Sequence, residues 1–191
     1  MIEAIQSVIK VTGVYRFSLA TLKTKEQKDL SRIISERRQR GLPYLELVRH
    51  LNTLCCAQIF EDKNMIVTSG LTLIANNFAE TAPDNVPKLN YTALGTASTA
   101  VSAGQTKLVT EYYRREVASS SNSAAILYLT AYYDATETSG LFKEAGVFAD
   151  ATGTADSGVL FSRTLLNAGA GINKTTSQTL TLDYTVTFTS S

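Results

Sequence analysis

Alternation of apolar and polar residues marks the end of the chain as a β-strand with two unlike faces. Between residues 179 and 189 every even position is apolar, and every odd position is Thr or Asp183. Because side chains alternate between the two faces of a strand, this pattern predicts one buried face and one hydroxyl-lined face that looks outward. Leu182, Tyr184 and Val186 are therefore expected in the core.

Shorter apolar runs separated by Gly, Ser, Thr, Asp and Asn predict further strands in the same part of the chain. These runs are residues 88–95, 112–120, 124–133, 141–148 and 159–166. Short strands at this spacing, joined by small polar turns, are typical of antiparallel sheets packed as a sandwich. One short helix opens this part, with Thr68 or Ser69 as its cap and an apolar face of Leu71, Ile74, Ala75 and Phe78.

A first helix is predicted from residue 24 onward, with both ends marked in the sequence. Thr24 followed by Gln27 is a capping box, and an Arg-rich stretch precedes Gly41 at the other end. The apolar positions form only a narrow stripe, which consists of Leu30, Ile33 and Ile34. Such a helix is expected to lie on the surface or to pack against a partner.

A second, more apolar helix is predicted over residues 43–60, with Pro43 in its first turn. This helix is expected to be the buried one of the pair. It carries the adjacent Cys55 and Cys56, the only cysteines of the chain, which we expect as buried free thiols. Residues 7–22, before both helices, have a mixed pattern that favours no single element.

Charge and composition change near residues 61–65. Residues 1–64 carry a net charge of +4, whereas residues 65–191 carry −3, and Ser and Thr make up 34 of the last 127 residues. We therefore predict a mainly β protein with an α-helical N-terminal part: a helical adaptor, residues 1–62, followed by an antiparallel β-sandwich, residues 65–191. The second part is expected to fold without the first.

The overall composition is that of a soluble globular protein, with 44% hydrophobic and 18% charged residues. No run of about 18 apolar residues occurs, and the N-terminal residues lack the apolar core and cleavage signature of a signal peptide. We expect the chain to be made in a cytoplasm and to have no membrane partner.

Catalytic and metal-binding patterns are not found in the sequence. The single histidine, His50, follows Glu46 by one helical turn and is expected to be a solvated or paired surface group. Acidic residues in the predicted loops do not have the spacing of a calcium loop, and no phosphate loop, dinucleotide fingerprint or nucleophile elbow occurs. We therefore predict no enzymatic activity, no catalytic residue, no cofactor, no metal and no small-molecule substrate.

The basic stretch at residues 35–41, between two helices, is faintly similar to a helix-turn-helix. A second helix that reads DNA needs polar and basic side chains, but the second helix here is mostly apolar. An acidic patch on a protein partner accounts for the same arginines. A nucleic-acid-binding regulator remains an alternative, which requires DNA binding that weakens steeply with salt.

Residues 65–191 resemble a group of small structural proteins of tailed bacteriophages, of the tail-fibre or minor virion type. The segments that carry the resemblance occur in the same order and spacing: "IVTSGLTLIANNFA", "YTALGTASTA", "LVTEYYRREV", "LFKEAGVF" with "LFSRTLL", and "KTTSQTLTLDYTVTF". They cover about two-thirds of the chain. Residues 1–64 depart from the pattern of this group.

The resemblance implies a non-enzymatic structural component of a virion, at the tail fibre, baseplate or neck, with a capsid decoration or head fibre protein as the alternative. It would be made in the host bacterial cytoplasm and assembled with copies of itself and other virion proteins. In this interpretation the first helix binds the partner, through Leu30, Ile33, Ile34, Arg37, Arg38 and Arg40. Glu144 and Gly146 are structural: Glu144 pairs with Arg114, Arg115 or Arg163, and Gly146 marks a bulge or a close backbone approach.

Overall fold

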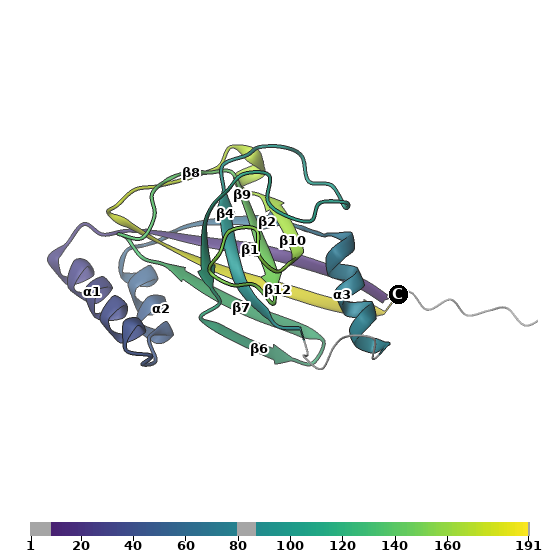
Figure 1. The fold of residues 1–191 in the computed structure, drawn as a ribbon. Coiled ribbons are helices and arrows are strands. Elements are labelled where there is room, and N and C mark those ends of the chain that lie inside the picture. The colour runs from purple at the N-terminus through teal and green to yellow at the C-terminus, as the bar shows by residue number, and fades with distance from the viewer. Residues whose placement is uncertain (1–8, 80–86, 191) are drawn as a thin grey trace, which may run out of the picture.

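The computed structural model describes residues 9–79 and 87–190 and is mainly β, with two five-stranded antiparallel sheets and few helices (Figure 1). Its helices are α1 (Lys25–Gln39), α2 (Leu45–Leu54), α3 (Thr68–Phe78) and the short 3-10 helix η1 (Leu166–Gly169). Its strands are β1 (Ile9–Thr21), β2 (Gln58–Lys63), β3 (Met65–Ile66), β4 (Leu89–Gly95), β5 (Glu111–Glu116), β6 (Ser119–Ser123), β7 (Ile126–Tyr133), β8 (Gly140–Phe142), β9 (Glu144–Ala149), β10 (Val159–Leu165), β11 (Ile172–Lys174) and β12 (Gln178–Ser190).

The first sheet has the strand order β2-β1-β12-β7-β6, and the second has the order β3-β10-β9-β4-β5. All five strand runs predicted before the last strand contain observed strands, and the terminal strand is observed as β12. Strands β8 and β11 form a separate two-stranded ladder. The connection from β5 to β6 carries the chain from the second sheet to the first.

The boundary expected at residues 61–65 does not separate two structural units. Strand β1 pairs with β12 along its whole length, with Ile9 opposite Ser190 and Thr21 opposite Gln178. Strand β2 then pairs with β1 between Val14 and Leu19. The N-terminal part therefore contributes two strands to one sheet, the edge strand β2 and the interior strand β1, which lies between β2 and β12.

One hydrophobic core lies between the two sheets. From the first sheet it contains Tyr15, Phe17 and Leu19 of β1 together with Leu180, Leu182, Tyr184 and Val186 of β12. From the second sheet it contains Leu94, Ala145, Val147 and Phe161. The prediction that the even positions of the last strand are buried is confirmed, since Leu182, Tyr184 and Val186 are all fully buried.

The other face of the first sheet is covered at one end by α1 and α2 (Figure 1). Thr179 and Thr181 were expected to look outward, but both are buried, and the Asn52 side chain of α2 donates to the Thr181 hydroxyl at 3.1 Å. Further along β12 the same face becomes half-buried, as at Thr185. The hydroxyl-lined face is thus partly an interior surface.

Both predicted N-terminal helices exist, but the second is shorter than expected. The capping box of Thr24 and Gln27 is present at the start of α1. Helix α2 ends at Leu54, and the segment expected to complete it forms β2 instead. Cys55 is half-buried and Cys56 is exposed, so the expectation of two buried thiols is wrong for Cys56.

Helix α3 begins at Thr68, without a side-chain cap from Thr68 or Ser69. The Ser69 hydroxyl instead donates to the backbone oxygen of Leu160 at 2.7 Å. A Cβ atom at Gly70 would lie 2.3 Å from the backbone oxygen of Phe161, so glycine allows α3 to approach β10 this closely. Leu71 of the expected apolar face is 47% exposed, because the helix turns its Gly70 side toward the sheet.

Candidate partner-binding surface

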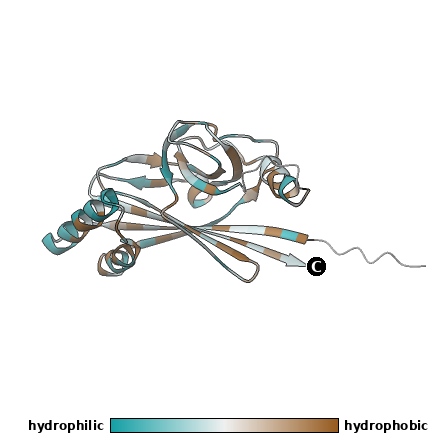
Figure 2. Ribbon diagram, turned by 60° about the horizontal axis from the view of Figure 1, so that its bottom comes forward, coloured by the Kyte–Doolittle hydropathy of each residue, from teal (hydrophilic) through white to brown (hydrophobic). Residues whose placement is uncertain are grey.

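Helices α1 and α2 form a hairpin at one end of the molecule, and Figure 2 shows that α1 is mostly hydrophilic. The turn between them is closed by its own backbone, because Leu42 N–H donates to Arg37 O at 2.9 Å and Gly41 N–H donates to Arg38 O at 3.0 Å. Gly41 has a φ of +65°, a conformation that glycine adopts without strain. The Arg37 side chain donates to Pro43 O at 2.8 Å and fixes the far side of the turn.

The apolar stripe predicted for partner binding is largely used inside the fold. Ile34 is fully buried in a cluster with Leu51 and Tyr132, and Leu30 packs against the same cluster. Ile33 is 40% exposed. Of the three predicted apolar contacts, only Ile33 therefore presents a substantial apolar surface to a partner, and the narrow stripe holds α1 on its own sheet.

The three predicted arginines also differ from one another. Arg38 forms an ion pair with Glu137, with 2.7 Å between its Nη2 and Oε1, and both side chains are largely buried. Arg37 is exposed but engaged with the turn, and Arg40 is exposed. Arg38 is therefore an internal anchor of α1, while Arg37 and Arg40 remain on the surface.

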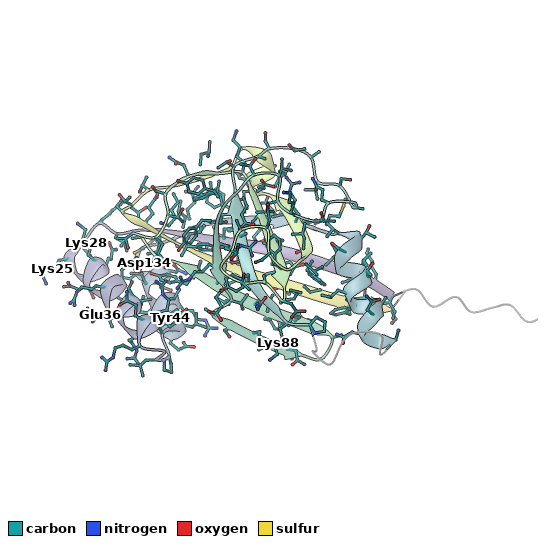
Figure 3. All side chains as sticks on the ribbon, viewed as in Figure 1. Lys25, Lys28, Glu36, Tyr44, Lys88 and Asp134 are labelled. Atoms are coloured by element: carbon teal, nitrogen blue, oxygen red, sulfur yellow. The ribbon has the colours of Figure 1, made fainter. Side chains whose placement is uncertain are left out.

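Polar groups at the end of β7 anchor the hairpin to the sheet. The Arg115 Nη1 atom lies 2.9 Å from Glu137 Oε1, so Glu137 joins β5 and α1. Asp134, which lies beside α1 (Figure 3), accepts a hydrogen bond from the Ser35 hydroxyl. Lys174 is buried beneath the same loop, where its Nζ donates to Thr138 O at 2.6 Å and to Ala135 O at 3.2 Å.

The buried Lys174 predicts a rise in stability with pH. Burial lowers the pKa of Lys174 from 10.5 to about 8, although nearby Asp134 and Glu137 act in the opposite direction. Between those two values the unfolded chain binds more protons than the native chain, so the free energy of unfolding increases with pH. We expect this increase in urea titrations between about pH 7.5 and about pH 9, below the range in which the tyrosines of the unfolded chain ionise, and we expect it to be absent in Lys174→Met.

Above about pH 9 the trend should reverse. Burial raises the pKa of the hydroxyls of Tyr15, Tyr132, Tyr133 and Tyr184 above 10.0. The unfolded chain then loses its phenolic protons first, which lowers the stability of the native state. A stability that falls steadily between about pH 7.5 and about pH 9 would contradict the assignment to Lys174.

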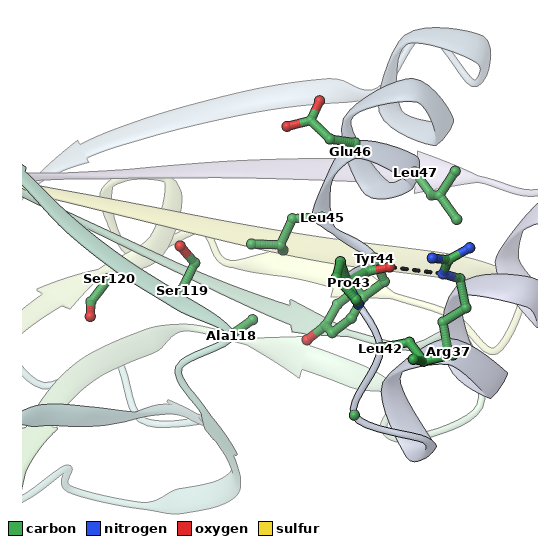
Figure 4. A pocket seen from close by; sticks show the side chains of 11 residues that line it. Arg37, Leu42, Pro43, Tyr44, Leu45, Glu46, Leu47, Ala118, Ser119 and Ser120 are labelled. Carbon is green, nitrogen blue, oxygen red and sulfur yellow. Dashed lines mark hydrogen bonds between the residues drawn. The ribbon is translucent and has the colours of Figure 1, made fainter.

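A hollow of about 750 Å³ lies beside the turn of the hairpin (Figure 4). The α1–α2 turn and the start of α2 form one wall, with Leu42, Pro43 and Leu45 as apolar lining. The segment that leads into β6 forms the opposite wall, with Ala118, Ser119 and Ser120. We call this the hairpin hollow. Leu42, at 40% exposure, adds apolar surface at its rim.

The hairpin hollow was not predicted from the sequence. The run "GLPYLEL" contains a signal that could have indicated it, because Leu42 lies between the turn residues Gly41 and Pro43, and turns run over the protein surface. The opposite wall comes from a segment about 75 residues away, which no local pattern connects to the turn.

Glu144 and Arg163 form a fully buried ion pair on the neighbouring strands β9 and β10. Arg163 Nε donates to Glu144 Oε2 at 2.7 Å, and both side chains are 0% exposed. The predicted pairing of Glu144 is therefore confirmed with Arg163. Arg114, the first of the three expected partners, pairs instead with the buried Glu111, at 2.6 Å.

The Glu144–Arg163 pair holds the long loop between β4 and β5. Glu144 accepts hydrogen bonds from Val109 N–H at 3.1 Å and Thr110 N–H at 2.8 Å. Arg163 donates to Thr99 O at 2.9 Å and to Gln105 Oε1 at 3.1 Å. A loop that has no regular secondary structure is thus fixed to the second sheet at both ends by one ion pair.

Two glycines make room for this arrangement. A Cβ atom at Gly95 would lie 2.5 Å from Thr110 O and 2.6 Å from Glu144 Cγ. At Gly146 it would lie 3.0 Å from side-chain carbons of Leu108 and Leu160, and the ladder between β9 and β10 shifts register in the adjoining residues. The expectation that Gly146 marks a close approach is confirmed.

Replacement of Glu144 by Ala is expected to lower the free energy of unfolding by about 3–5 kcal/mol, because it leaves the Arg163 guanidinium buried without a counter-charge. Glu144→Gln keeps hydrogen-bond acceptors in place and should cost less. Lys107→Ala breaks the exposed pair with Asp156 and should change stability by about 0.5 kcal/mol or less. Chemical denaturation measures all three, and equal losses for Glu144→Ala and Lys107→Ala would contradict a structural role of the pair.

The histidine and the acidic residues considered as catalytic or metal-binding candidates lie on the surface or form structural contacts. His50 is exposed on α2, and Glu46 pairs with Arg49. Asp150 accepts from the backbone N–H of Lys88 at 3.1 Å. Within residues 9–79 and 87–190, no group of three or more His, Cys, Asp or Glu side chains is arranged to hold a metal ion.

None of the helices in the described ranges is both long and apolar enough to span a bilayer.

The chain shows no significant match to any protein-family model, curated protein or solved structure.

Proposed function

We propose that this chain is a non-enzymatic structural component of a tailed bacteriophage particle, at the tail fibre, baseplate or neck. In this proposal the two sheets form a sandwich-like body, and the α1–α2 hairpin is the adaptor that binds a neighbouring virion protein. A capsid decoration or head fibre protein would use the same parts in another position of the particle.

The proposal is carried by one observation: residues in the segments that resemble the phage proteins make close packing contacts in the fold. Gly70, Gly95, Glu144 and Gly146 belong to those segments, and each makes a close contact along β9 or β10 or with the loop between β4 and β5. The shared residues thus build the body of the fold and its largest loop. A resemblance based on such residues favours a common structural role.

The surface of the hairpin supports the adaptor part of the proposal. Ile33 and Leu42 are each 40% exposed, Arg37 and Arg40 stand near them, and the hairpin hollow opens beside the turn. Exposed apolar side chains and exposed arginines on one hairpin fit a partner that offers apolar and acidic groups.

The structure weakens the alternative that this chain binds nucleic acid, which depends on the basic stretch at residues 35–41. Arg38 is paired with Glu137, and Arg37 donates to Pro43 O. Arg38 is therefore committed to an ion pair within the fold, while Arg37 and Arg40 stay exposed, so the basic stretch has one charge fewer to offer to phosphate groups.

Incorporation into particles tests the proposal. The variant Ile33→Asp with Arg40→Glu changes only exposed side chains, one in α1 and one at its C-cap, and should fold like the natural chain. We expect the amount found in purified particles, measured by quantitative mass spectrometry, to fall about tenfold or more, which corresponds to about 1.4 kcal/mol of binding.

Lys107→Glu, which reverses an exposed charge far from the hairpin, is the matched control and should be incorporated normally. A variant with Ile33→Asp and Ile34→Asp would not test the adaptor role, because Ile34 is fully buried and its replacement would unfold the chain. Undiminished incorporation of the α1 variant would refute the adaptor role.

A further inference from the structure

Strand β6 is an edge strand without the usual protection against further pairing. In the described part of the chain it ends the first sheet and pairs only with β7. Its sequence, Ser-Ser-Ser-Asn-Ser, contains neither charge nor proline, and four of its five residues are exposed. The other long edges, β2 and β5, carry several charged residues, and β3 has only two residues. Edges that must remain unpaired are usually blocked by charges, proline or bulges.

The outward backbone groups of β6 belong to Ser120 and Asn122. Strands β6 and β7 are joined by a two-residue turn, so Ser123 and Ile126, which flank it, form a hydrogen-bonded pair. Such pairs recur at every second residue of an antiparallel ladder, which directs the N–H and C=O groups of the odd-numbered residues of β6 toward β7. The N–H and C=O groups of Ser120 and Asn122 therefore point away from the sheet, where they can pair with a further strand.

A second copy of β6 fits this edge without bringing like charges together. In a two-fold pairing the two identical strands run antiparallel, and the residue on the axis faces its own counterpart. With Ser121 on the axis, Ser120 would form a hydrogen-bonded backbone pair with Asn122 of the second copy, and all five residues would overlap. Residues 117–133 contain no charged side chain, so no charge meets its own copy. A two-fold pairing of β5 about its centre would instead oppose two glutamates, one from each end of the strand.

The β6–β7 turn of the second copy would arrive at the hairpin hollow. In the register centred on Ser121, residues 123 and 124 of the second copy lie beside residues 119 and 118. Ala118 and Ser119 belong to one wall of the hairpin hollow, and the opposite wall contributes the apolar side chains of the α1–α2 turn (Figure 4). A small apolar group at the tip of the second copy's turn would cover part of this apolar surface.

That turn carries an exposed pair of alanines, Ala124 and Ala125. Ala124 has a φ of +48°, a left-handed conformation that costs alanine more than it costs glycine or asparagine. Two-residue hairpin turns are therefore usually built from Asn-Gly, Asp-Gly or a glycine pair. Alanine brings no advantage to an isolated turn, whereas its small apolar side chain gains by burial against another copy.

The other face of β6 also suits an uncharged strand. Ser120 lies opposite Leu129, a residue of the core between the sheets, so its side chain is on the inter-sheet face. A second hollow of about 440 Å³ includes Ser120, Leu127 and Leu129. Asn122 of the second copy would stand beside Ser120 at the rim of this hollow, where an amide and a hydroxyl can hydrogen-bond. A charged edge such as β2 or β5 would instead bring charges close to these leucines.

We propose that two copies of this chain pair through β6 about a two-fold axis at Ser121. The five strands of the first sheet in each copy then form one continuous antiparallel sheet. This pairing goes beyond the proposed function, because it uses only this chain and needs no virion partner. Ile33 and Arg40, on which the adaptor role depends, do not line the hairpin hollow and stay accessible in the pair.

Exchange of charge at the axis tests the inference by sedimentation of the full chain. The natural chain should have twice the mass of one chain. Ser121→Lys and Ser121→Asp each set two like charges face to face, so each variant alone should have the mass of one chain. An equal mixture should regain the two-chain mass, because opposite charges then face each other, and this recovery also shows that both variants are folded. Ser102→Lys, in an exposed loop, is the matched control and should still form pairs.

Disulfide formation tests the register, in a background of Cys55→Ala with Cys56→Ser that removes both natural thiols. At the axis the two Cα atoms should be about 4.5 Å apart, as in a non-hydrogen-bonded pair, which is within disulfide range. Ser121→Cys should therefore form covalent dimers on mild oxidation. Ser119→Cys alone should not, because its counterpart lies about 13 Å away along the strand. Ser119→Cys mixed with Ser123→Cys should form covalent dimers.

Three results would overturn the inference: a natural chain that has the mass of one chain, a mixture of the two charge variants that stays monomeric, or Ser119→Cys that couples to itself as efficiently as Ser121→Cys. Incorporation into particles separates the two proposals. A monomeric natural chain that is still incorporated refutes the β6 pairing alone, whereas a paired chain that is missing from particles refutes the proposed function alone.

Discussion

A chain that begins at Met65 is expected to remain unfolded, although composition alone had suggested that it would fold. Without β1, the terminal strand β12 loses its partner along thirteen residue pairs. The core between the sheets loses Tyr15, Phe17 and Leu19, each almost completely buried. Burial of each such side chain contributes about 1.5–3 kcal/mol, so their loss alone approaches the whole stability of a typical domain, about 5–15 kcal/mol.

Circular dichroism and amide exchange measure this effect. The shortened chain should lack the β-sheet signal of the full chain and should exchange its amides without protection. The full chain, prepared in the same way, is the control. Protected amides in β9, β10 and β12 of the shortened chain would show that the second sheet and the terminal strand form without the N-terminal strands. That result would support the predicted division of the chain into two domains at residues 61–65.

Val186→Asp is expected to remove about 5 kcal/mol or more of stability. Val186 is fully buried in the core, between the sheets, and neighbours other apolar residues there. The substitution loses about 1.5–3 kcal/mol of apolar burial and adds several kcal/mol for a carboxylate without a counter-charge. At this cost much of the protein should be unfolded at room temperature.

Thr185→Asp is the matched control, because it places the same carboxylate one residue away on the opposite, half-buried face of β12. It should cost about 1 kcal/mol or less. Thermal unfolding of both variants provides the comparison. Equal losses would show that both faces of β12 are closed to water at this point, for example by contact with another copy.

Strand β12 was predicted from the sequence, whereas its partner β1 was not. In the second half of β12, one face of the sheet is accessible to solvent and the other is buried in the core, so polar and apolar residues alternate along the strand. In β1, residues 17–20 are buried on both faces because α1 and α2 cover the side opposite the core. The core face of β1 is nevertheless present in the sequence, where Ile9, Val11, Tyr15, Phe17 and Leu19 stand at odd positions among mostly polar residues. Gly13 and Val14 interrupt this alternation, which made the pattern look mixed.

The division into two parts failed for a related reason. The net charge and the Ser and Thr content do change near residue 64, but these quantities describe composition and contain no information about pairing. The ladder between Ile9 and Ser190 joins the two extremes of the described chain. Such long-range pairing depends on packing that composition does not report.

The candidate surface was predictable in part. Helical periodicity correctly groups Leu30, Ile33 and Ile34 on one side of α1, but it cannot tell how much of that side the remaining protein covers. The pairing of Arg38 with Glu137 depends on residues 99 positions apart. Glu144 could be assigned to an arginine because a lone acidic residue within an apolar strand requires a counter-charge.

Electron microscopy of the intact particle, with the chain located in the density map, tests the proposed function most directly. We predict that the two-sheet body is found in several symmetric copies at the tail fibre, baseplate or neck, with the α1–α2 hairpin in contact with a neighbouring protein. A particle that is complete and infectious but contains no copy of this chain would contradict the proposal.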